Sequence, residues 1–406
     1  MFRAVLHLTH KVIHGMDGLY PQFVDKACVI CGSSLYFQEK NLTYSHVNRL
    51  KNEGLVMNTK LWTVDKEEPL KYSYPQIKEA SDLLQQGEVV AFPTETVYGL
   101  GANALSDQAV LKIFEAKGRP SDNPLIVHIT KHEQLTGLVD NLTGTAHKLM
   151  EAFWPGPLTL VLPKKEGVSQ YVTAGLDTLA VRMPDHPVAR ALMEVSGLPL
   201  AAPSANLSGK PSPTSAKHVE EDLIHKISGI VDAGATGVGL ESTVVDCTTE
   251  IPVILRPGGV TKEQLEEVVG IVQVDPALLT QEEKHKPKSP GMKYTHYAPV
   301  APVYLVEGSK AFLQTTLAAA QAEGRKIGLL ATEETISQTD TTDITAIACG
   351  TKTDLATVAT QLYDALRAFN ATDVDVIFSE TFPKQGVGVA IMNRLEKAAG
   401  HKIIRE

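Results

Sequence analysis

The sequence between about Glu88 and Val260 alternates short apolar runs with helix-like segments, and this alternation constrains the fold more than any other feature. The runs are rich in Val, Ile and Leu, and Gly or Pro residues separate them from their neighbours. Strands that alternate with helices in this way are typical of an α/β sheet. The expected strands are EVVAF, PLIVHI, LTLVLP, TLAVRM, LPLAA, GIVDA, STVVD and PVILR.

Two helices in this region have recognisable ends. One is expected from about Ser106 to Lys117, and Gly118 predicts its C-terminal end because glycine readily adopts the left-handed conformation found there. The other begins at Thr261, where Thr-x-x-Gln with Gln264 predicts a capping box before LEEVVG. We therefore expect helices to flank the sheet.

A second α/β region follows a change in composition. Residues 273–300 are polar, proline-containing and without periodicity, so we interpret them as a linker. Residues 301–406 then alternate apolar runs with helical segments in a Rossmann-like rhythm. The loops of this C-terminal domain hold few ionisable clusters, so we expect the chemistry to lie in the first domain, residues 57–272.

Residues 1–56 fit neither pattern. A zinc site could be assembled from two cysteines and three histidines of this segment, which are Cys28, Cys31, His7, His10 and His14. Nothing after Cys31 completes a second ligand pair, so a weakly ordered extension is the alternative that we favour. Met57 could also be the true start of the protein.

The composition excludes several classes of protein. A hydrophobic content of 43% with 21% charged residues is typical of a globular protein, and 406 residues predict two or three domains. No apolar run approaches the length of a membrane span. Four cysteines provide no disulfide framework, which favours the reducing cytoplasm. The net charge of −9 argues against a global attraction to nucleic acid.

Four cations nevertheless lie at the ends of the expected elements: Lys117, Arg119, Arg182 and Arg256. Lys117 and Arg119 alone could simply interact with the dipole of the helix that they end. Arginine in an apolar strand, in contrast, is seldom buried unless it pairs with a carboxylate or a phosphate. As a set, the four cations predict one anion-binding cleft.

His128 lies in PLIVHI, a strand with two apolar faces. A buried imidazole needs a hydrogen-bond partner or a ligand, and a core histidine satisfied by its neighbours is the alternative. Other polar side chains follow strands elsewhere: Ser204, Asn206 and Ser208 after LPLAA, and Ser242 and Thr243 in LESTVVD. We expect these groups to face the same cleft.

The loop AFPTETVYGLGANA satisfies a loose dinucleotide fingerprint at Gly99, Gly101 and Ala104. The context argues against a nicotinamide-dependent oxidoreductase, because residues 94–98 separate the glycines from the preceding strand. We interpret the stretch as a polar loop whose hydroxyl groups face a ligand. A Walker loop, a Gly-x-Ser-x-Gly elbow and a His-Glu-x-x-His motif are all missing from the sequence. Charge-stabilising donors without an evident nucleophile favour phosphoryl or nucleotidyl transfer.

Eight motifs in order resemble the YrdC-like family: FPTETVYGLG, KGRPSDNPLIVHI, FWPGPLTLVLP, VRMPDHP, PSANLSGKPSPT, ESTVVD, LRPGG and SPGMKYTHYAP. Together with the trailing domain they resemble its longer form, the threonylcarbamoyl-AMP synthases, over about Met57 to Glu406. The resemblance implies a twisted, mixed, open sheet with flanking helices and a smaller Rossmann-like α/β domain at the C-terminus.

The resemblance also implies a reaction. L-threonine, bicarbonate and ATP, with Mg²⁺ on the ATP but no dedicated protein ligand for the metal, give threonylcarbamoyl-AMP and pyrophosphate. The product serves the threonylcarbamoyladenosine modification of tRNA beside the anticodon. A separate transferase complex is expected to carry out that transfer, and stable tRNA binding is not expected, in agreement with the acidic composition.

The resemblance assigns roles to individual positions. The catalytic group comprises Lys117, Arg119, Ser204 and Asn206. The ATP contacts are Arg119, Asn123, Thr178, Asn206, Thr214 and Arg256, to which Lys293, His296 and Tyr297 of the linker would add a gate over the mouth. The L-threonine contacts are Thr96, His128, Arg182, Ser204 and Ser242. A plain tether is the alternative to the gate.

Two further functions stay open. A non-catalytic module for double-stranded RNA or tRNA would bind with a steep dependence on salt. A carbamoyl-phosphate-using transferase would contain acylphosphatase-like and zinc-finger segments, which we do not find in the sequence.

Overall fold

The computed structural model describes residues 30–31, 34–35, 57–65, 75–278 and 296–406. The chain divides into two compact units, Met1–Asn58 and Thr59–Glu406. The described part of the first unit is an antiparallel pair of short strands, β1 (Ile30–Cys31) and β2 (Ser34–Leu35). Four of the five residues considered for zinc (His7, His10, His14 and Cys28) lie outside the described residues, and the side chain of Cys31 is not described. The described residues contain no group of three or more potential metal ligands.

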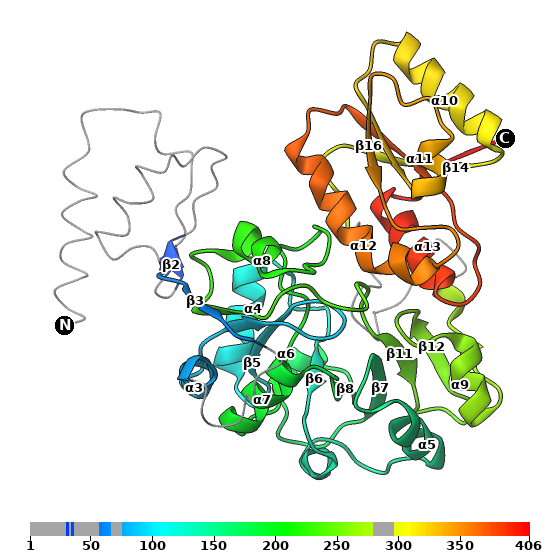
Figure 1. Cartoon of the computed structure of the whole chain (residues 1–406). Helices are drawn as coiled ribbons and strands as arrows, with labels where there is room; N and C mark the ends of the chain where they lie inside the picture. Colours follow the sequence, from blue (N-terminus) through cyan, green and yellow to red (C-terminus); the bar gives the residue numbers. More distant parts are fainter. Residues whose placement is uncertain (1–29, 32–33, 36–56, 66–74, 279–295) are drawn as a thin grey trace, which may run out of the picture. The chain divides into compact units, whose positions relative to one another are not determined.

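The second unit contains an eleven-stranded mixed sheet in the order β13-β12-β11-β7-β8-β6-β9-β5-β4-β10-β3 (Figure 1). Its strands are β3 (Lys60–Thr63), β4 (Val90–Phe92), β5 (Gly99–Asn103), β6 (Ile126–His128), β7 (Leu158–Pro163), β8 (Thr178–Arg182), β9 (Leu200–Ala201), β10 (Gly229–Asp232), β11 (Thr243–Asp246), β12 (Val253–Arg256) and β13 (Gln273–Val274). All eight strands expected from the apolar runs are present, and the prediction of a mixed sheet is confirmed.

Strand β5 corrects the interpretation of the glycine-rich stretch as a loop. It pairs antiparallel with β4, so that Val90 lies opposite Gly101. A Cβ atom at Gly101 would lie 2.6 Å from the ring of Phe92, so glycine is needed for the two strands to pack. The glycines therefore serve the packing of the sheet rather than the approach of a phosphate.

Helices cover both faces of this sheet. They are α3 (Pro75–Gln85), α4 (Asp107–Lys117), α5 (Gly144–Phe153), α6 (Gln170–Thr173), α7 (Pro187–Ser196), α8 (Ala216–Leu223) and α9 (Lys262–Val269), with 3₁₀ turns η1 (His132–Gly137) and η2 (Pro276–Leu278). Alternate residues of β4 enter different cores: Ala91 packs in the cluster that includes α4 and α5, and Phe92 in the cluster that includes α3 and α7. This alternation is the period of two expected for a strand between two layers.

The predicted helix ends are confirmed. Ser106 caps α4 by accepting a hydrogen bond from the Ala109 N–H, and Gly118 ends the helix in the left-handed conformation with φ of 59°. Thr261 and Gln264 form the capping box of α9. The position of Lys117 in the last turn of α4 is thus fixed by local sequence signals.

The C-terminal part has a five-stranded, wholly parallel sheet in the order β16-β15-β17-β14-β18. Its strands are β14 (Val303–Glu307), β15 (Ile327–Ala331), β16 (Ile344–Ala348), β17 (Val376–Glu380) and β18 (Ile403–Arg405), and its helices are α10 (Lys310–Ala322), α11 (Glu333–Ser337), α12 (Leu355–Ala368), the 3₁₀ turn η3 (Phe369–Ala371) and α13 (Gly388–Ala398). The predicted linker begins inside the large sheet, because β13 pairs with β12. No described helix is long and apolar enough to cross a membrane.

Candidate active site

Strand pairing brings the predicted strand-end residues together. Strands β6 and β8 run parallel with His128 opposite Arg182, and Thr159 of the antiparallel β7 lies opposite Arg182 on the other side. Strand β11 continues the sheet beside β7, and its register places Val244 opposite Arg256 of β12. Side chains that are far apart in the sequence therefore meet at one edge of the sheet.

A pocket lies at this edge, and its space, including the part open to solvent, is about 720 Å³. All four predicted cations line it. The predicted residues in its wall are Thr96, Lys117, Arg119, His128, Arg182, Ser204, Asn206, Ser242, Arg256, His296 and Tyr297. The predicted cleft with converging cations is thus present in the structure.

Ser208 also lines this wall, as expected, whereas five predicted residues do not. Thr243 lies in β11, and its hydroxyl donates to the Val260 carbonyl at 2.5 Å. Asn123 is buried behind Arg119, and Thr214 is buried with its hydroxyl 3.4 Å from Nδ1 of His218. Thr178 begins β8, whereas Arg182 ends it, so the two lie at opposite ends of one strand. Lys293 lies outside the described residues.

Lys117 is buried, and its ammonium holds a loop rather than the end of its own helix. Nζ donates to the carbonyl oxygens of Ser204 at 2.5 Å and Asn206 at 2.6 Å. The Ser204 hydroxyl donates to Oδ1 of Asn206 at 2.6 Å, which links three of the four predicted catalytic residues. Burial, with a smaller effect of nearby Arg119, holds the pKa of Lys117 well below its usual value.

Arg119 has hydrogen-bonding capacity to spare. One terminal nitrogen lies 3.4 Å from the Asn123 carbonyl and 3.3 Å from the Pro124 carbonyl. Nε of Arg119 and Oδ1 of Asn123 are both buried without a hydrogen-bond partner among the described residues. Burial lowers the pKa of Arg119 to about 10. A buried donor and acceptor left unpaired beside a pocket indicate a place for a ligand.

The guanidinium of Arg182 already contacts other groups of the protein. It donates to the Gly156 carbonyl at 3.2 Å and to the Thr96 hydroxyl at 2.9 Å. Its remaining nitrogen lies 2.6 Å from a Glu95 carboxylate oxygen, an ion pair without an aligned hydrogen bond. A carboxylate ligand would therefore have to share or displace Glu95, a partner that the sequence analysis did not identify.

His128 has a defined donor pattern. Nδ1 lies 3.3 Å from the Ile126 carbonyl, which can only accept, so Nδ1 carries the proton and Nε2 is left as an acceptor. Burial, and then the charge of Arg182, lower the pKa of His128 to about 3. The ring is therefore neutral and can accept a hydrogen bond from a hydroxyl or an ammonium group in the pocket.

Ser242 lies between two neighbours that fix its hydroxyl. It is 2.7 Å from the Thr159 hydroxyl, and Arg256 donates to its Oγ at 3.1 Å and to its carbonyl at 2.9 Å. These contacts fix the Ser242 hydroxyl and the Arg256 guanidinium in place, and both residues line the pocket.

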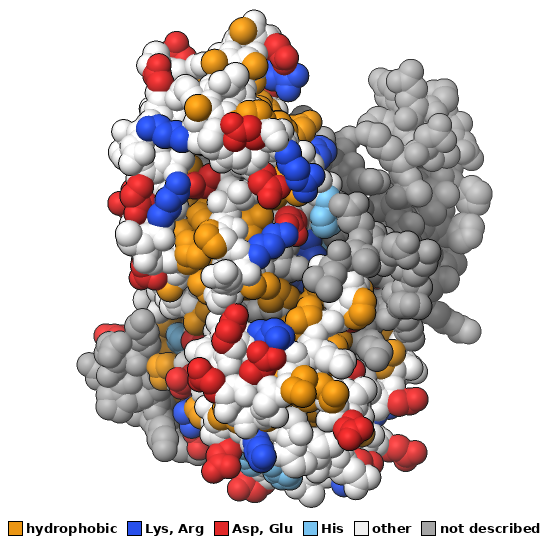
Figure 2. Space-filling view, turned by 90° about the vertical axis from the view of Figure 1, so that its right-hand side faces the viewer, with side chains coloured by type: hydrophobic (Ala, Val, Ile, Leu, Met, Phe, Trp, Pro, Cys, Tyr) orange, Lys and Arg blue, Asp and Glu red, His pale blue; other side chains and the backbone are white. Residues whose placement is uncertain are grey.

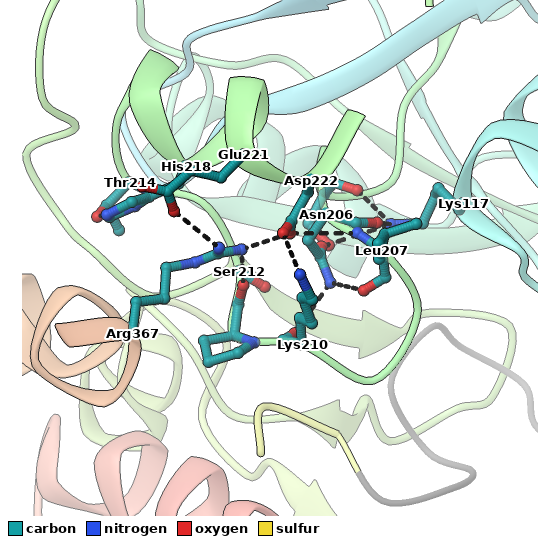
Figure 3. Close-up of polar contacts among 12 residues, drawn as sticks. Lys117, Asn206, Leu207, Lys210, Ser212, Thr214, His218, Glu221, Asp222 and Arg367 are labelled. Atoms are coloured by element: carbon teal, nitrogen blue, oxygen red, sulfur yellow. Dashed lines mark hydrogen bonds and ion pairs between the residues drawn. The ribbon is translucent and has the colours of Figure 1, made fainter. Parts of the chain in front are cut away.

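Sequence reasoning missed Lys210, Asp222 and Arg367 (Figure 3). Lys210 lines the pocket, and its ammonium is 2.8 Å from Asp222 Oδ1. Oδ2 of Asp222 accepts from Arg367 of α12 at 2.7 Å and from the Leu207 N–H at 3.3 Å. Burial alone would raise the pKa of Asp222, but Arg367 and Lys210 lower it. The buried carboxylate therefore ties the 204–210 loop to the C-terminal domain.

The C-terminal domain supplies no described residue of the pocket wall, but its helices contact that wall. Glu241 of the pocket wall is paired with Arg394 of α13, Nε to Oε2, at 2.8 Å. Its carboxylate also accepts from Ser212 at 2.6 Å and from Tyr363 of α12 at 2.9 Å. The sequence analysis did not predict the contacts of Glu241 with Arg394 and Tyr363, because these partners are more than a hundred residues away along the chain.

The family is established by comparison with known proteins. A family model described as "Telomere recombination" (Sua5/YciO/YrdC) matches residues 82–258, and one described as "Threonylcarbamoyl-AMP synthase, C-terminal domain" matches residues 260–400. The threonylcarbamoyl-AMP synthase of Bacillus subtilis is 57% identical over 350 residues, which are 86% of this chain and 100% of the relative. The chain belongs to the threonylcarbamoyl-AMP synthase family. The predicted family resemblance is confirmed.

Solved structures of the threonylcarbamoyl-AMP synthase family agree. The threonylcarbamoyl-AMP synthase of Pyrococcus abyssi is 48% identical over 339 residues, 81% of this chain and 96% of the relative. The crystal structure of P. abyssi Sua5 complexed with L-threonine has a TM-score of 0.80 at 46% identity, and the match covers 86% of this chain and 100% of that chain. The two-domain α/β architecture is therefore that of the family.

Proposed function

We propose that this protein synthesises L-threonylcarbamoyl-AMP from L-threonine, bicarbonate and ATP, with release of pyrophosphate. The observation that carries the proposal is the convergence of Lys117, Arg119, Arg182 and Arg256 on one pocket of an acidic chain. A pocket lined by these four cations and Lys210, with Glu241 as the one carboxylate of its described wall, suits a triphosphate and an amino-acid carboxylate together. Two relatives of this chain, at 57% and 48% identity, are named threonylcarbamoyl-AMP synthase.

The ATP side of the pocket is assigned to Lys117, Arg119, Asn206 and Arg256. The unpaired Nε of Arg119 and the orientation of Arg256 by Ser242 support this assignment. Asn123 does not line the described wall, but its Oδ1 is buried without a hydrogen-bond partner among the described residues, which supports its assignment as a further contact. Thr178 and Thr214 would need a change in the structure to do so, and they are the weakest members of the predicted set.

The L-threonine side is assigned to Thr96, His128, Arg182, Ser204 and Ser242. Arg182 would bind the substrate carboxylate in exchange for Glu95, whose ion pair is not an aligned hydrogen bond. The acceptor Nε2 of His128 suits the substrate's hydroxyl or ammonium group. A pocket that pairs with the hydroxyl would reject valine by about 10⁴-fold or more, whereas serine, which lacks only a methyl group, would be excluded less well.

The reaction would proceed in two balanced steps. The neutral threonine amine attacks the carbon of bicarbonate, and loss of water leaves an N-carboxylate. An oxygen of this carboxylate attacks the α-phosphorus of ATP, and the bond to pyrophosphate breaks as the new P–O bond forms. Lys117 and Arg119 stabilise the charge that develops on the phosphate, and they do so from fixed positions.

Mg²⁺ would travel with the ATP. The described residues contain no group of three or more potential ligands, and the carboxylate of Glu241 in the pocket wall is taken by Arg394. Because the one carboxylate of the described wall is already paired, we propose that the phosphates of ATP hold the metal. No step of the mechanism above depends on a protein ligand for the metal.

A downstream transferase complex would deliver the product to tRNA. Figure 2 shows a face on which Lys and Arg side chains are interspersed with Asp and Glu rather than gathered in one basic patch. Such a face offers little non-specific attraction to tRNA, in keeping with an enzyme that hands on a small adenylate.

Pyrophosphate release tests the proposed function. The protein is incubated with ATP and Mg²⁺, with L-threonine and bicarbonate added singly and together. We expect release only when both are present, with L-valine as an inactive control. Release that is independent of threonine would overturn the proposal.

A further inference from the structure

The wall of the pocket around Glu241 is completed by the C-terminal domain. Arg394 is fully buried, and it donates to Glu241 at 2.8 Å and to the Pro257 carbonyl at 2.9 Å. Pro257 directly follows Arg256, a cation of the ATP side. One side chain of α13 therefore holds Glu241 of the pocket wall and the residue next to Arg256, another member of that wall.

Glu241 creates an electrostatic problem in a site that binds anions. A buried carboxylate beside Arg256 would repel phosphate and compete for the guanidinium if it had no other partner. Arg394 supplies that partner, and Ser212 and Tyr363 satisfy the remaining lone pairs. Burial alone would raise the pKa of Glu241, but Arg394 and Arg256 lower it to about 2, so the carboxylate stays ionised and paired.

Two helices of the C-terminal domain, α12 and α13, hold Tyr297 of the pocket wall. Its ring stacks on Tyr363 of α12 with 5.3 Å between the ring centroids. The guanidinium of Arg394, a residue of α13, lies 5.6 Å from the centroid of the Tyr297 ring. Tyr297 is buried between these neighbours, and this fixes it at the pocket wall.

We infer that Arg394 and Tyr363 of the C-terminal domain are positioning residues of the ATP site. Arg394 cancels the Glu241 charge next to Arg256, and Tyr363 holds Glu241 and Tyr297 in place. The ligand that benefits is an anionic nucleoside triphosphate, so the inference rests on the proposed function. The C-terminal domain is then part of the site and not an appendage to it.

Charge removal distinguishes this role from a merely structural one. Arg394→Met removes the ion pair of Glu241 and leaves its negative charge uncompensated beside Arg256, so KM for ATP should rise at least tenfold while KM for L-threonine changes less than threefold. The double variant Glu241→Gln with Arg394→Met removes the stranded charge and should recover most of the ATP affinity. Tyr363→Phe keeps the ring stack and should raise KM for ATP by a smaller factor. Steady-state kinetics and melting temperature are measured on the full chain.

Asp364→Ala is the matched control. Asp364 lies beside Tyr363 on α12, and its contact is with His218 of α8 at 3.1 Å, outside the pocket wall. This variant should leave both KM values as in the wild type. If the wild type releases no threonine-dependent pyrophosphate, the proposed function fails. If the wild type is active, an unchanged KM for ATP in both Arg394→Met and Tyr363→Phe overturns the inference. An equal rise in both KM values, or a double variant no better than Arg394→Met, overturns it as well.

Discussion

Lys117 shows how burial sets the pH range in which a single residue is charged. Its ammonium lies among the carbonyl oxygens of Ser204 and Asn206, away from water. A neutral amine could still donate to both oxygens, but only the charged ammonium would attract a phosphate. The function of the residue therefore depends on keeping a proton that burial makes easier to lose.

The pH dependence of activity should report this loss. Since the pKa of Lys117 is well below its usual 10.5, the charged form disappears at lower pH than in an exposed lysine. We expect kcat/KM for ATP to fall as pH rises, with a midpoint clearly below 10.5. Lys117→Met should lose about 10²- to 10³-fold in kcat/KM and show no such alkaline limb. A wild-type profile that is flat up to the range of ordinary lysines would contradict this.

His128 should affect stability in the acid range. Its pKa is about 3 in the folded protein against 6.5 in the unfolded chain. Between these values the unfolded chain binds more protons, so the free energy of unfolding falls as pH drops from about 6.5 toward 3. His128→Asn should flatten this dependence relative to the wild type, measured by urea unfolding at several pH values. His147→Asn, at an exposed position, is the control, and equal slopes for all three proteins would refute the prediction.

At the scale of elements, the 204–210 loop depends on a carboxylate of α8. Asp222 binds Lys210 and the Leu207 N–H of the loop, and it also binds Arg367, so it connects the loop to α12. The loop in turn presents Ser204 and Asn206 to the pocket. The geometry of the catalytic group is therefore set partly by a residue that does not line the pocket.

Asp222→Asn should weaken both the fold and the site. Loss of one partner of a buried ion pair typically costs about 3 to 5 kcal/mol of the free energy of unfolding. We expect a loss of this size in chemical denaturation, together with a raised KM for ATP. Glu221→Gln is the matched control, because this neighbour on α8 is half exposed and its carboxylate is 4.0 Å from Arg367. Equal effects of the two substitutions would count against the anchoring role.

The sequence allowed the strands and most of the pocket wall to be predicted, because both depend on local signals. Apolar runs located the strands, cations at strand ends located Arg182 and Arg256, and the end of a helix located Lys117. Strand β5 was not predicted, because its glycines are typical of a loop. In the structure they leave room for the ring of Phe92. The pairings of Arg182 with Glu95 and of Glu241 with Arg394 also escaped, since they join residues 87 and 153 positions apart, and periodicity carries no information at that range.

At the scale of the whole molecule, the described residues that line the pocket lie between Thr94 and Tyr297, within the second unit, Thr59–Glu406. Glu241 and Asp222 have ion-pair partners in α13 and α12. The two family models match residues 82–258 and 260–400, which also lie in this unit.

Removal of residues 1–56 should leave catalysis unchanged. We expect the chain 57–406 to release pyrophosphate with the kcat and KM values of the full chain, measured side by side. A loss of more than threefold in kcat/KM for either substrate would show that the first unit takes part in the site.

Incorporation of labelled bicarbonate tests the central claim most directly, because it requires ATP and L-threonine to share one pocket. The full chain is given ¹⁴C-bicarbonate, ATP and L-threonine, and labelled adenylate is compared with pyrophosphate in a single turnover. The account predicts one labelled threonylcarbamoyl-AMP for each pyrophosphate in the wild type, and formation of both products slowed by about 10²-fold or more in Lys117→Met and Arg182→Ala. Pyrophosphate without labelled adenylate, or full activity of both variants, would contradict it.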